Sequence, residues 1–149
     1  QYLWREYKYG KTDADAHLFE NTKPYLSDPT NHEKKLVRYY YNDKEDMFDA
    51  VSYNKGGTIL HMLRNYLGDS AFFEGLKEYL TTYQYGSAEV HQLRLIFEKI
   101  TGKDLNWFFN QWYFNNGHPK LEVKSSYLPP PPIEPICTSF AFTSKMQPV

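Results

Sequence analysis

The sequence predicts a mainly α-helical fold, because apolar residues recur at helical spacing in one segment after another along most of the chain. Short connections join the later segments, which is typical of helices that pack antiparallel or at right angles. Only one segment, near residue 121, alternates as a strand does. A glycine, which commonly ends a helix, follows several of the helical segments. These glycines are Gly10, Gly68, Gly102 and Gly117.

Two helices are expected at the start of the chain. The first one ends at Gly10, and Thr12 or Asp13 can cap a second helix that runs to about Tyr25. Residues 27–33 contain the run Ser-Asp-Pro-Thr-Asn, which predicts a loop.

The strongest helical pattern starts near Asp49 and ends at Gly68. Three more helices follow it, and we expect Asp69, Ser87 and Asp104 to cap them in turn. Because these helices come one directly after another, they are expected to share one apolar core.

Extended structure is expected in two places. Residues 36–41 are β-branched and aromatic, which predicts a short extended piece. Residues 121–125 alternate between apolar and polar side chains and predict a strand, for which we expect no partner strand in this chain. Residues 129–132 are four prolines, a stiff spacer, and residues 133–149 form an irregular tail with little periodicity.

Composition excludes several classes of protein. The net charge is −1, with 17 basic and 18 acidic residues, which argues against a nucleic-acid-binding protein. No apolar run approaches the roughly 18 residues that a membrane-spanning helix needs. The single cysteine, Cys137, excludes an intrachain disulfide. The chain begins without Met, a basic segment or a secretory apolar core, so we expect it to be cut from a longer polypeptide.

The histidines do not predict a zinc site. His32-Glu33 begins like a zinc-protease signature, but Leu36 stands where the second histidine is required. The other histidines are scattered, so we assign no metal ligand. Nucleophilic catalysis has no better support, because the chain lacks a Gly-x-Ser-x-Gly turn and Cys137 lies in the irregular tail.

Two glycines and a tyrosine stand out near the start of the strongest helix. Adjacent glycines inside a helix cost roughly 1 kcal/mol each relative to alanine, so Gly56-Gly57 suggests close approach of another segment. Tyr53 lies on the first turn, where a phenol can point into a cleft and donate a hydrogen bond to an oxyanion. The alternative is a half-buried structural tyrosine, which the pattern alone favours.

Several segments together resemble the gluzincin aminopeptidases, the family of aminopeptidase N. Residues 51–63, Val-Ser-Tyr-Asn-Lys-Gly-Gly-x-x-Leu-x-Met-Leu, resemble the family's Tyr-x-Lys-Gly segment. Residues 67–80 resemble its next helix pair, and residues 101–123 resemble its closing helices and the start of its β-sandwich. Residues 2–7 resemble the helix that follows the third zinc ligand. The segments occur in the family's order, from residue 1 to about residue 125.

The resemblance implies that the chain is the helical C-terminal subdomain of a thermolysin-like catalytic domain. It implies a zinc metalloprotease, a hydrolase that removes N-terminal residues from peptides. In this family an H-E-x-x-H helix and a downstream Glu hold one zinc, which polarises the scissile carbonyl and activates water. A tyrosine at the position of Tyr53 stabilises the oxyanion, so Tyr53 is the candidate catalytic residue. Asp49, Val51 and Ser52 are candidates for the wall of the substrate cleft.

The family's zinc ligands and its amine-anchoring motif have no counterpart in this chain, so we expect it to be inactive alone. The expected division is a helical part of a metallopeptidase catalytic domain (1–118), a strand entering a β-sandwich-like region (119–128), and a Pro-rich linker with an irregular tail (129–149). Expected partners are peptide substrates, the missing N-terminal half of the catalytic domain, and a second copy of the chain.

Two other functions remain open from the sequence. The chain could be a non-catalytic helical interaction or scaffold module derived from the same fold, and an intact H-E-x-x-H motif upstream would decide against that. It could also be an independently folding peptide-binding domain, which the aromatic content of 18% permits.

Overall fold

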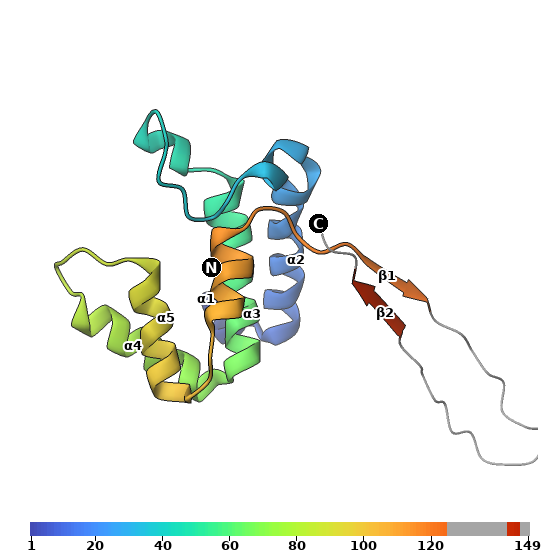
Figure 1. The fold of residues 1–149 in the computed structure, drawn as a ribbon. Helices are drawn as coiled ribbons and strands as arrows, with labels where there is room; N and C mark the ends of the chain where they lie inside the picture. The colour runs from blue at the N-terminus through green and yellow to red at the C-terminus, as the bar shows by residue number, and fades with distance from the viewer. Residues whose placement is uncertain (125–142, 147–149) are drawn as a thin grey trace, which may run out of the picture. The chain divides into compact units, whose positions relative to one another are not determined.

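The computed structural model describes residues 1–124 and 143–146, and it confirms the predicted mainly helical fold (Figure 1). The chain divides into two compact units, residues 1–116 and 117–149. The first unit contains α1 (Tyr2–Tyr9), α2 (Lys11–Ser27), α3 (Gly56–Leu67), α4 (Asp69–Thr82), α5 (Val90–Thr101) and α6 (Asn106–Phe109). Shorter turns are the 3-10 helices η1 (Pro29–Glu33) and η2 (Lys44–Met47) and the π-helical turns η3 (Val51–Lys55) and η4 (Asn110–Phe114).

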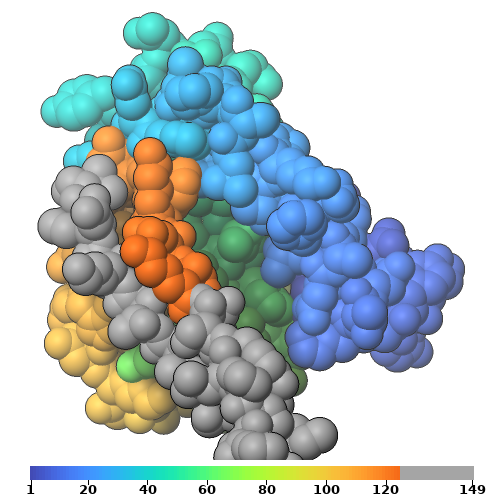
Figure 2. All heavy atoms as spheres, turned by 90° about the vertical axis from the view of Figure 1, so that its right-hand side faces the viewer, coloured from blue at the N-terminus to red at the C-terminus, as the bar shows by residue number. Residues whose placement is uncertain are grey.

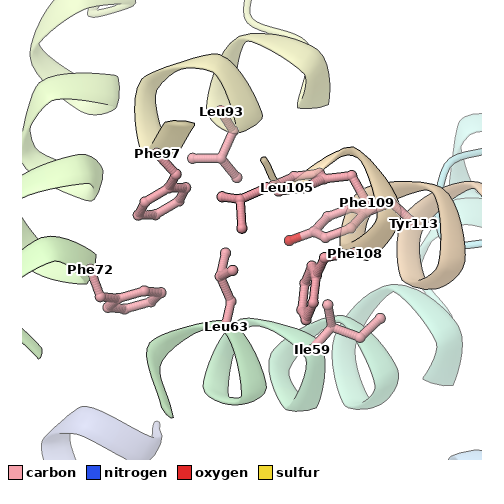
Figure 3. Packing of buried hydrophobic residues seen from close by; sticks show 9 residues of the cluster. All are labelled: Ile59, Leu63, Phe72, Leu93, Phe97, Leu105, Phe108, Phe109 and Tyr113. Atoms are coloured by element: carbon pink, nitrogen blue, oxygen red, sulfur yellow. The ribbon is translucent and has the colours of Figure 1, made fainter. Parts of the chain in front are cut away.

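The core of the first unit forms where α3 meets α4, α5 and the α6–η4 segment (Figure 3). Phe72 and Phe97 stack with ring centroids 5.8 Å apart, and Phe109 stacks on Tyr113 at 4.7 Å. The buried members of this core are Ile59, Leu63, Phe72, Leu93, Phe97, Leu105, Phe108, Phe109 and Tyr113. Burying aromatic rings of this size contributes much of the free energy that fixes α3 in place.

A largely buried arginine ties the N-terminal helix to this core. The guanidinium of Arg64 in α3 donates to Glu6 of α1 at 2.6 Å and to Asp69 at the start of α4 at 2.7 Å. These hydrogen bonds raise the pKa of Arg64 further above its ordinary value. The cation is therefore paired on two sides, as a buried charge requires.

None of the predicted cap residues is the N-cap of its helix. α2 begins directly after Gly10, and the Asp13 carboxylate accepts two hydrogen bonds from Arg5, at 2.8 and 2.9 Å, instead of capping the helix. α5 begins after Glu89 and not after Ser87, because Glu89 forms a capping box with the helix.

α4 begins after Gly68, and Asp69 is its first residue, whose carboxylate accepts from Arg64. α6 begins after Leu105, although the carboxylate of Asp104 accepts from the backbone amide of Asn106 at 2.8 Å.

The extended piece expected at residues 36–41 does not form a strand. Leu36 and Val37 pack against the helical core instead. The backbone amide of Val37 donates to the carbonyl oxygen of Tyr113 at 3.0 Å. Burial of the apolar side chains against helices therefore replaces the strand pairing that their composition suggested.

The second unit contains the predicted strand, but the expectation that it lacks a partner is wrong. β1 (Leu121–Lys124) pairs antiparallel with β2 (Thr143–Met146), with Leu121 opposite Met146. The sequence Thr-Ser-Lys-Met of β2 has little of the apolar alternation that marks a strand. Residues 129–132 and Cys137 lie outside the described residues. Among those that are described, no helix is long and apolar enough to cross a membrane.

Candidate functional site

Tyr53 lies in the π-helical turn η3, which runs without a break into α3. Single π-helical turns within helices often occur at functional sites. The backbone amide of Tyr53 donates to the carbonyl oxygen of Asp49 at 3.1 Å. The residue is 62% exposed, and its ring lies 6.1 Å from that of Phe48. Its phenol therefore faces away from the core, at the start of a helix that the core holds firmly.

The glycine pair that follows this turn is crowded on one side only. A Cβ atom on Gly56 would lie 3.3 Å from Cδ1 of Leu36, whereas one on Gly57 would meet no atom within 4 Å. The expected close approach is therefore confirmed for Gly56 and wrong for Gly57. Gly56 lets the segment that carries Leu36 lie directly against the start of α3.

Arg38, Asp49 and Ser52 form a hydrogen-bonded cluster beside the turn. The guanidinium of Arg38 donates to both carboxylate oxygens of Asp49, at 2.7 and 3.1 Å, and to the hydroxyl of Ser52 at 2.9 Å. The Asp49 carboxylate also accepts from the backbone amide of Ser52 at 2.9 Å. Lys34 lies at the edge, 3.5 Å from the same carboxylate.

The electrostatics of the cluster keep Asp49 ionised. Burial acts to raise the pKa of Asp49, but the hydrogen bonds from Arg38 and from the Ser52 amide, with the positive charges of Arg38 and Lys34, lower it to about 2. A bidentate arginine–carboxylate pair is among the strongest hydrogen-bonded arrangements in proteins. The carboxylate is therefore charged and held at any physiological pH.

Three of the four site residues predicted from the sequence lie together in the structure, and the fourth is buried. Asp49, Ser52 and Tyr53 meet around the first turn, whereas the side chain of Val51 is fully buried. The roles of Asp49, Val51 and Ser52 in a substrate cleft stay predictions. Arg38 was not found from the sequence, because no local pattern links it to a carboxylate 11 residues later.

The segment that carries Arg38 lies at the surface, at the top of the view in Figure 2, where it is light blue to turquoise. It surrounds an open hollow of about 700 Å³. The residues that line the hollow are Lys34, Arg38, Tyr39, Tyr40, Tyr41, Asn42, Asp46 and Met47.

Lys55, at the end of η3, is buried without a counterion. It is 4% exposed, and no described group accepts a hydrogen bond from its ammonium. The Nζ atom lies 5.5 Å from the ring centroid of Tyr25, which is a cation–π contact. Desolvation lowers the pKa of Lys55 below its ordinary value of 10.5.

We expect Lys55→Met to raise the free energy of unfolding by about 1 kcal/mol at pH 7, because it removes a buried charge and keeps the apolar stem. The folded state releases the lysine proton more easily than the unfolded state does. The stability of the unsubstituted protein should therefore increase as the pH rises towards 10.5, and the gain from the substitution should shrink. Thermal unfolding of the parent and of the Lys55→Met variant between pH 7 and pH 10 measures the difference in stability and its change with pH. A variant less stable than the parent at pH 7 would show that the ammonium has a partner.

The described residues contain no group of three His, Cys, Asp or Glu side chains that could hold a metal ion. The described residues therefore do not fit a zinc site.

Comparison with known proteins assigns the family. The model described as the peptidase family M1 domain matches residues 1–112. The chain belongs to peptidase family M1. The match includes Tyr53 and the whole Arg38–Asp49–Ser52 cluster, and it confirms the resemblance to aminopeptidase N-like enzymes.

Several proteins that the chain resembles are aminopeptidases by name. Aminopeptidase M1-C of Oryza sativa subsp. japonica is 29% identical over 98 residues, which are 66% of this chain and 11% of that protein. Aminopeptidase N of Lactococcus lactis subsp. lactis is 39% identical over 79 residues, which are 52% of this chain and 9% of that protein. The chain thus spans about a tenth of the length of these relatives.

A solved structure shows the same fold. Aminopeptidase A of Legionella pneumophila, crystallised in complex with aspartic acid, matches with a TM-score of 0.63 and 20% identity. The match covers 86% of this chain and 14% of that one. The helices described above therefore have the arrangement of a segment of a known aminopeptidase.

Proposed function

We propose that residues 1–149 are part of a zinc-dependent aminopeptidase that removes N-terminal residues from peptides, and that Tyr53 donates a hydrogen bond to the oxyanion. The observation that carries the proposal is the placement of Tyr53. Its exposed phenol stands on a turn fixed to the core, within the stretch that matches the M1 family.

The chemistry needs a donor of this kind. When a nucleophile attacks a peptide carbonyl, negative charge grows on the carbonyl oxygen, and a donor about 2.7–3.1 Å from that oxygen stabilises the transition state. The phenol of Tyr53 is an O–H donor on a side chain that is 62% exposed. It is therefore free to turn towards a substrate carbonyl, and the Tyr53→Phe substitution tests this role.

The rest of the machinery is proposed to lie outside these residues. The chain covers about a tenth of its relatives, and its described part has no metal-ligand group. We propose that the zinc ligands belong to another part of the full-length protein. We also propose that this part covers the exposed apolar residues Leu3, Trp4 and Tyr7 of α1. Without it, the same face would favour self-association.

The isolated 149-residue chain should therefore hold no zinc and cleave no aminoacyl substrate. Elemental analysis after dialysis measures the metal, and release of a chromogenic amine from an aminoacyl anilide measures the activity. The full-length protein, measured in parallel, should retain about one zinc per chain. One tightly held zinc on the isolated chain would contradict the proposal, whereas weak binding that dialysis removes would not.

A further inference from the structure

We propose that Arg38 is a positioning residue for Tyr53 and acts through the carboxylate of Asp49. This inference rests on the proposed role of Tyr53 and adds to it the group that holds the phenol in place. Arg38 binds Asp49, whose carboxylate accepts from the Ser52 amide and whose carbonyl oxygen accepts from the amide of Tyr53.

The Arg38 end of this connection is fixed to the core. The amide of the preceding residue, Val37, is bonded to the carbonyl oxygen of Tyr113 at 3.0 Å. Leu36 packs against Gly56 at the start of α3, so closely that a Cβ atom on Gly56 would lie 3.3 Å from Cδ1 of Leu36. The side chain of Arg38 is only 15% exposed. The guanidinium therefore projects from a backbone that has little freedom to move.

The Asp49 end is fixed to the turn. Its carboxylate accepts from the Ser52 amide at 2.9 Å, and its carbonyl oxygen accepts from the Tyr53 amide at 3.1 Å. Arg38 also donates directly to the Ser52 hydroxyl at 2.9 Å. One guanidinium thus binds both Asp49 and Ser52 in the first turn, and Tyr53 is the next residue after Ser52.

Loss of the Arg38 guanidinium should therefore shift the position of the Tyr53 phenol. The Asp49 carboxylate is 17% exposed and would keep only the Ser52 amide at 2.9 Å and the Lys34 ammonium at 3.5 Å as partners. A displacement of about 1 Å at a reacting group can cost about 10²-fold in rate. We expect Arg38→Met in the full-length enzyme to lower kcat at least about tenfold and to change KM less than about threefold.

The test is a double-substitution cycle on kcat. If Arg38 acts through the Tyr53 hydroxyl, Arg38→Met should lower kcat about tenfold in the parent and less than about twofold in a protein that already carries Tyr53→Phe. Asp49→Asn, which keeps the shape of the side chain and removes its charge, should show the same dependence. Arg38→Lys should not restore the rate, because a lysine cannot form the paired contacts of a guanidinium.

A matched control is available in α5. Arg94 binds Glu98 at 2.6 Å with side-chain exposures of 16% and 19%, and Glu98 also accepts from the backbone amide of Leu105 at 2.9 Å. Arg94→Met removes an ion pair of similar exposure that lies far along the chain from Tyr53. It should lower the melting temperature as Arg38→Met does and leave kcat within about twofold.

Equal losses from Arg38→Met in both backgrounds, or no loss in the parent, would overturn the inference while the role of Tyr53 stands. If Tyr53→Phe by itself leaves kcat unchanged, the proposed function of Tyr53 fails first, and the inference fails with it. The two failures are therefore distinguished by the single Tyr53→Phe variant.

Discussion

Replacement of Tyr53 by phenylalanine in the full-length protein should lower kcat about 10²–10³-fold and leave KM nearly unchanged. The substitution removes one hydroxyl group and keeps the ring. The hydrogen bond that it removes strengthens as charge develops on the carbonyl oxygen, so its loss affects turnover more than substrate binding. Steady-state kinetics with an aminoacyl anilide, at substrate concentrations on both sides of KM, separate the two effects.

The fold should tolerate this change. Tyr53 is 62% exposed, and the contact of its ring with Phe48 does not involve the hydroxyl. The melting temperature of the variant should therefore equal that of the parent within about 1 °C, because surface changes of this kind stay within about 0.5 kcal/mol. A lower rate at unchanged stability would separate a chemical role from a structural one.

Nearby tyrosines provide the control. Tyr39, Tyr40 and Tyr41 are also exposed, and they belong to the surface segment that precedes the turn. Their substitution by phenylalanine should leave kcat within a few-fold of the parent. If Tyr53→Phe turned over substrate at the rate of these controls, Tyr53 would be one more surface aromatic residue.

The helices could be predicted because their signals are local. Periodic apolar side chains and a glycine such as Gly10, Gly68 or Gly102 mark a helix within a single window of sequence, and α1, α3 and α5 end where these signals indicate. β2 could not be predicted, because its four residues owe their conformation to pairing with β1, about 20 positions earlier in the chain.

The site shows the same contrast. Tyr53 was found because a recognisable segment surrounds it, and the turn confirms its place at the start of the helix. Arg38 was missed, because no sequence spacing links it to Asp49. The two side chains meet only because the backbone of residues 39–48 leads from one to the other. The preference of Leu36 and Val37 for the helical core sets that path, and their composition alone suggested a strand.

The second large effect is expected for Gly75 in α4, where alanine should lower the free energy of unfolding by about 3 kcal/mol. A Cβ atom at this position would lie 2.4 and 2.5 Å from two ring carbons of Phe97. The Phe97 side chain is fully buried and stacked on Phe72, so the ring cannot move aside without disturbing the core. The better helix propensity of alanine, about 1 kcal/mol, does not offset this clash.

Gly57 in α3 is the matched control, because it is also a helical glycine, but a Cβ atom added to it would have no neighbouring atom within 4 Å. Gly57→Ala should raise the free energy of unfolding by about 0.5–1 kcal/mol, since it restricts the unfolded chain without creating a contact. Chemical denaturation of both variants and of the parent measures the free energy of unfolding, which should fall for Gly75→Ala and rise for Gly57→Ala. Equal stabilisation by both substitutions would show that α4 and α5 separate enough to admit a methyl group, and that the packing of Phe97 against Gly75 is looser than the structure has it.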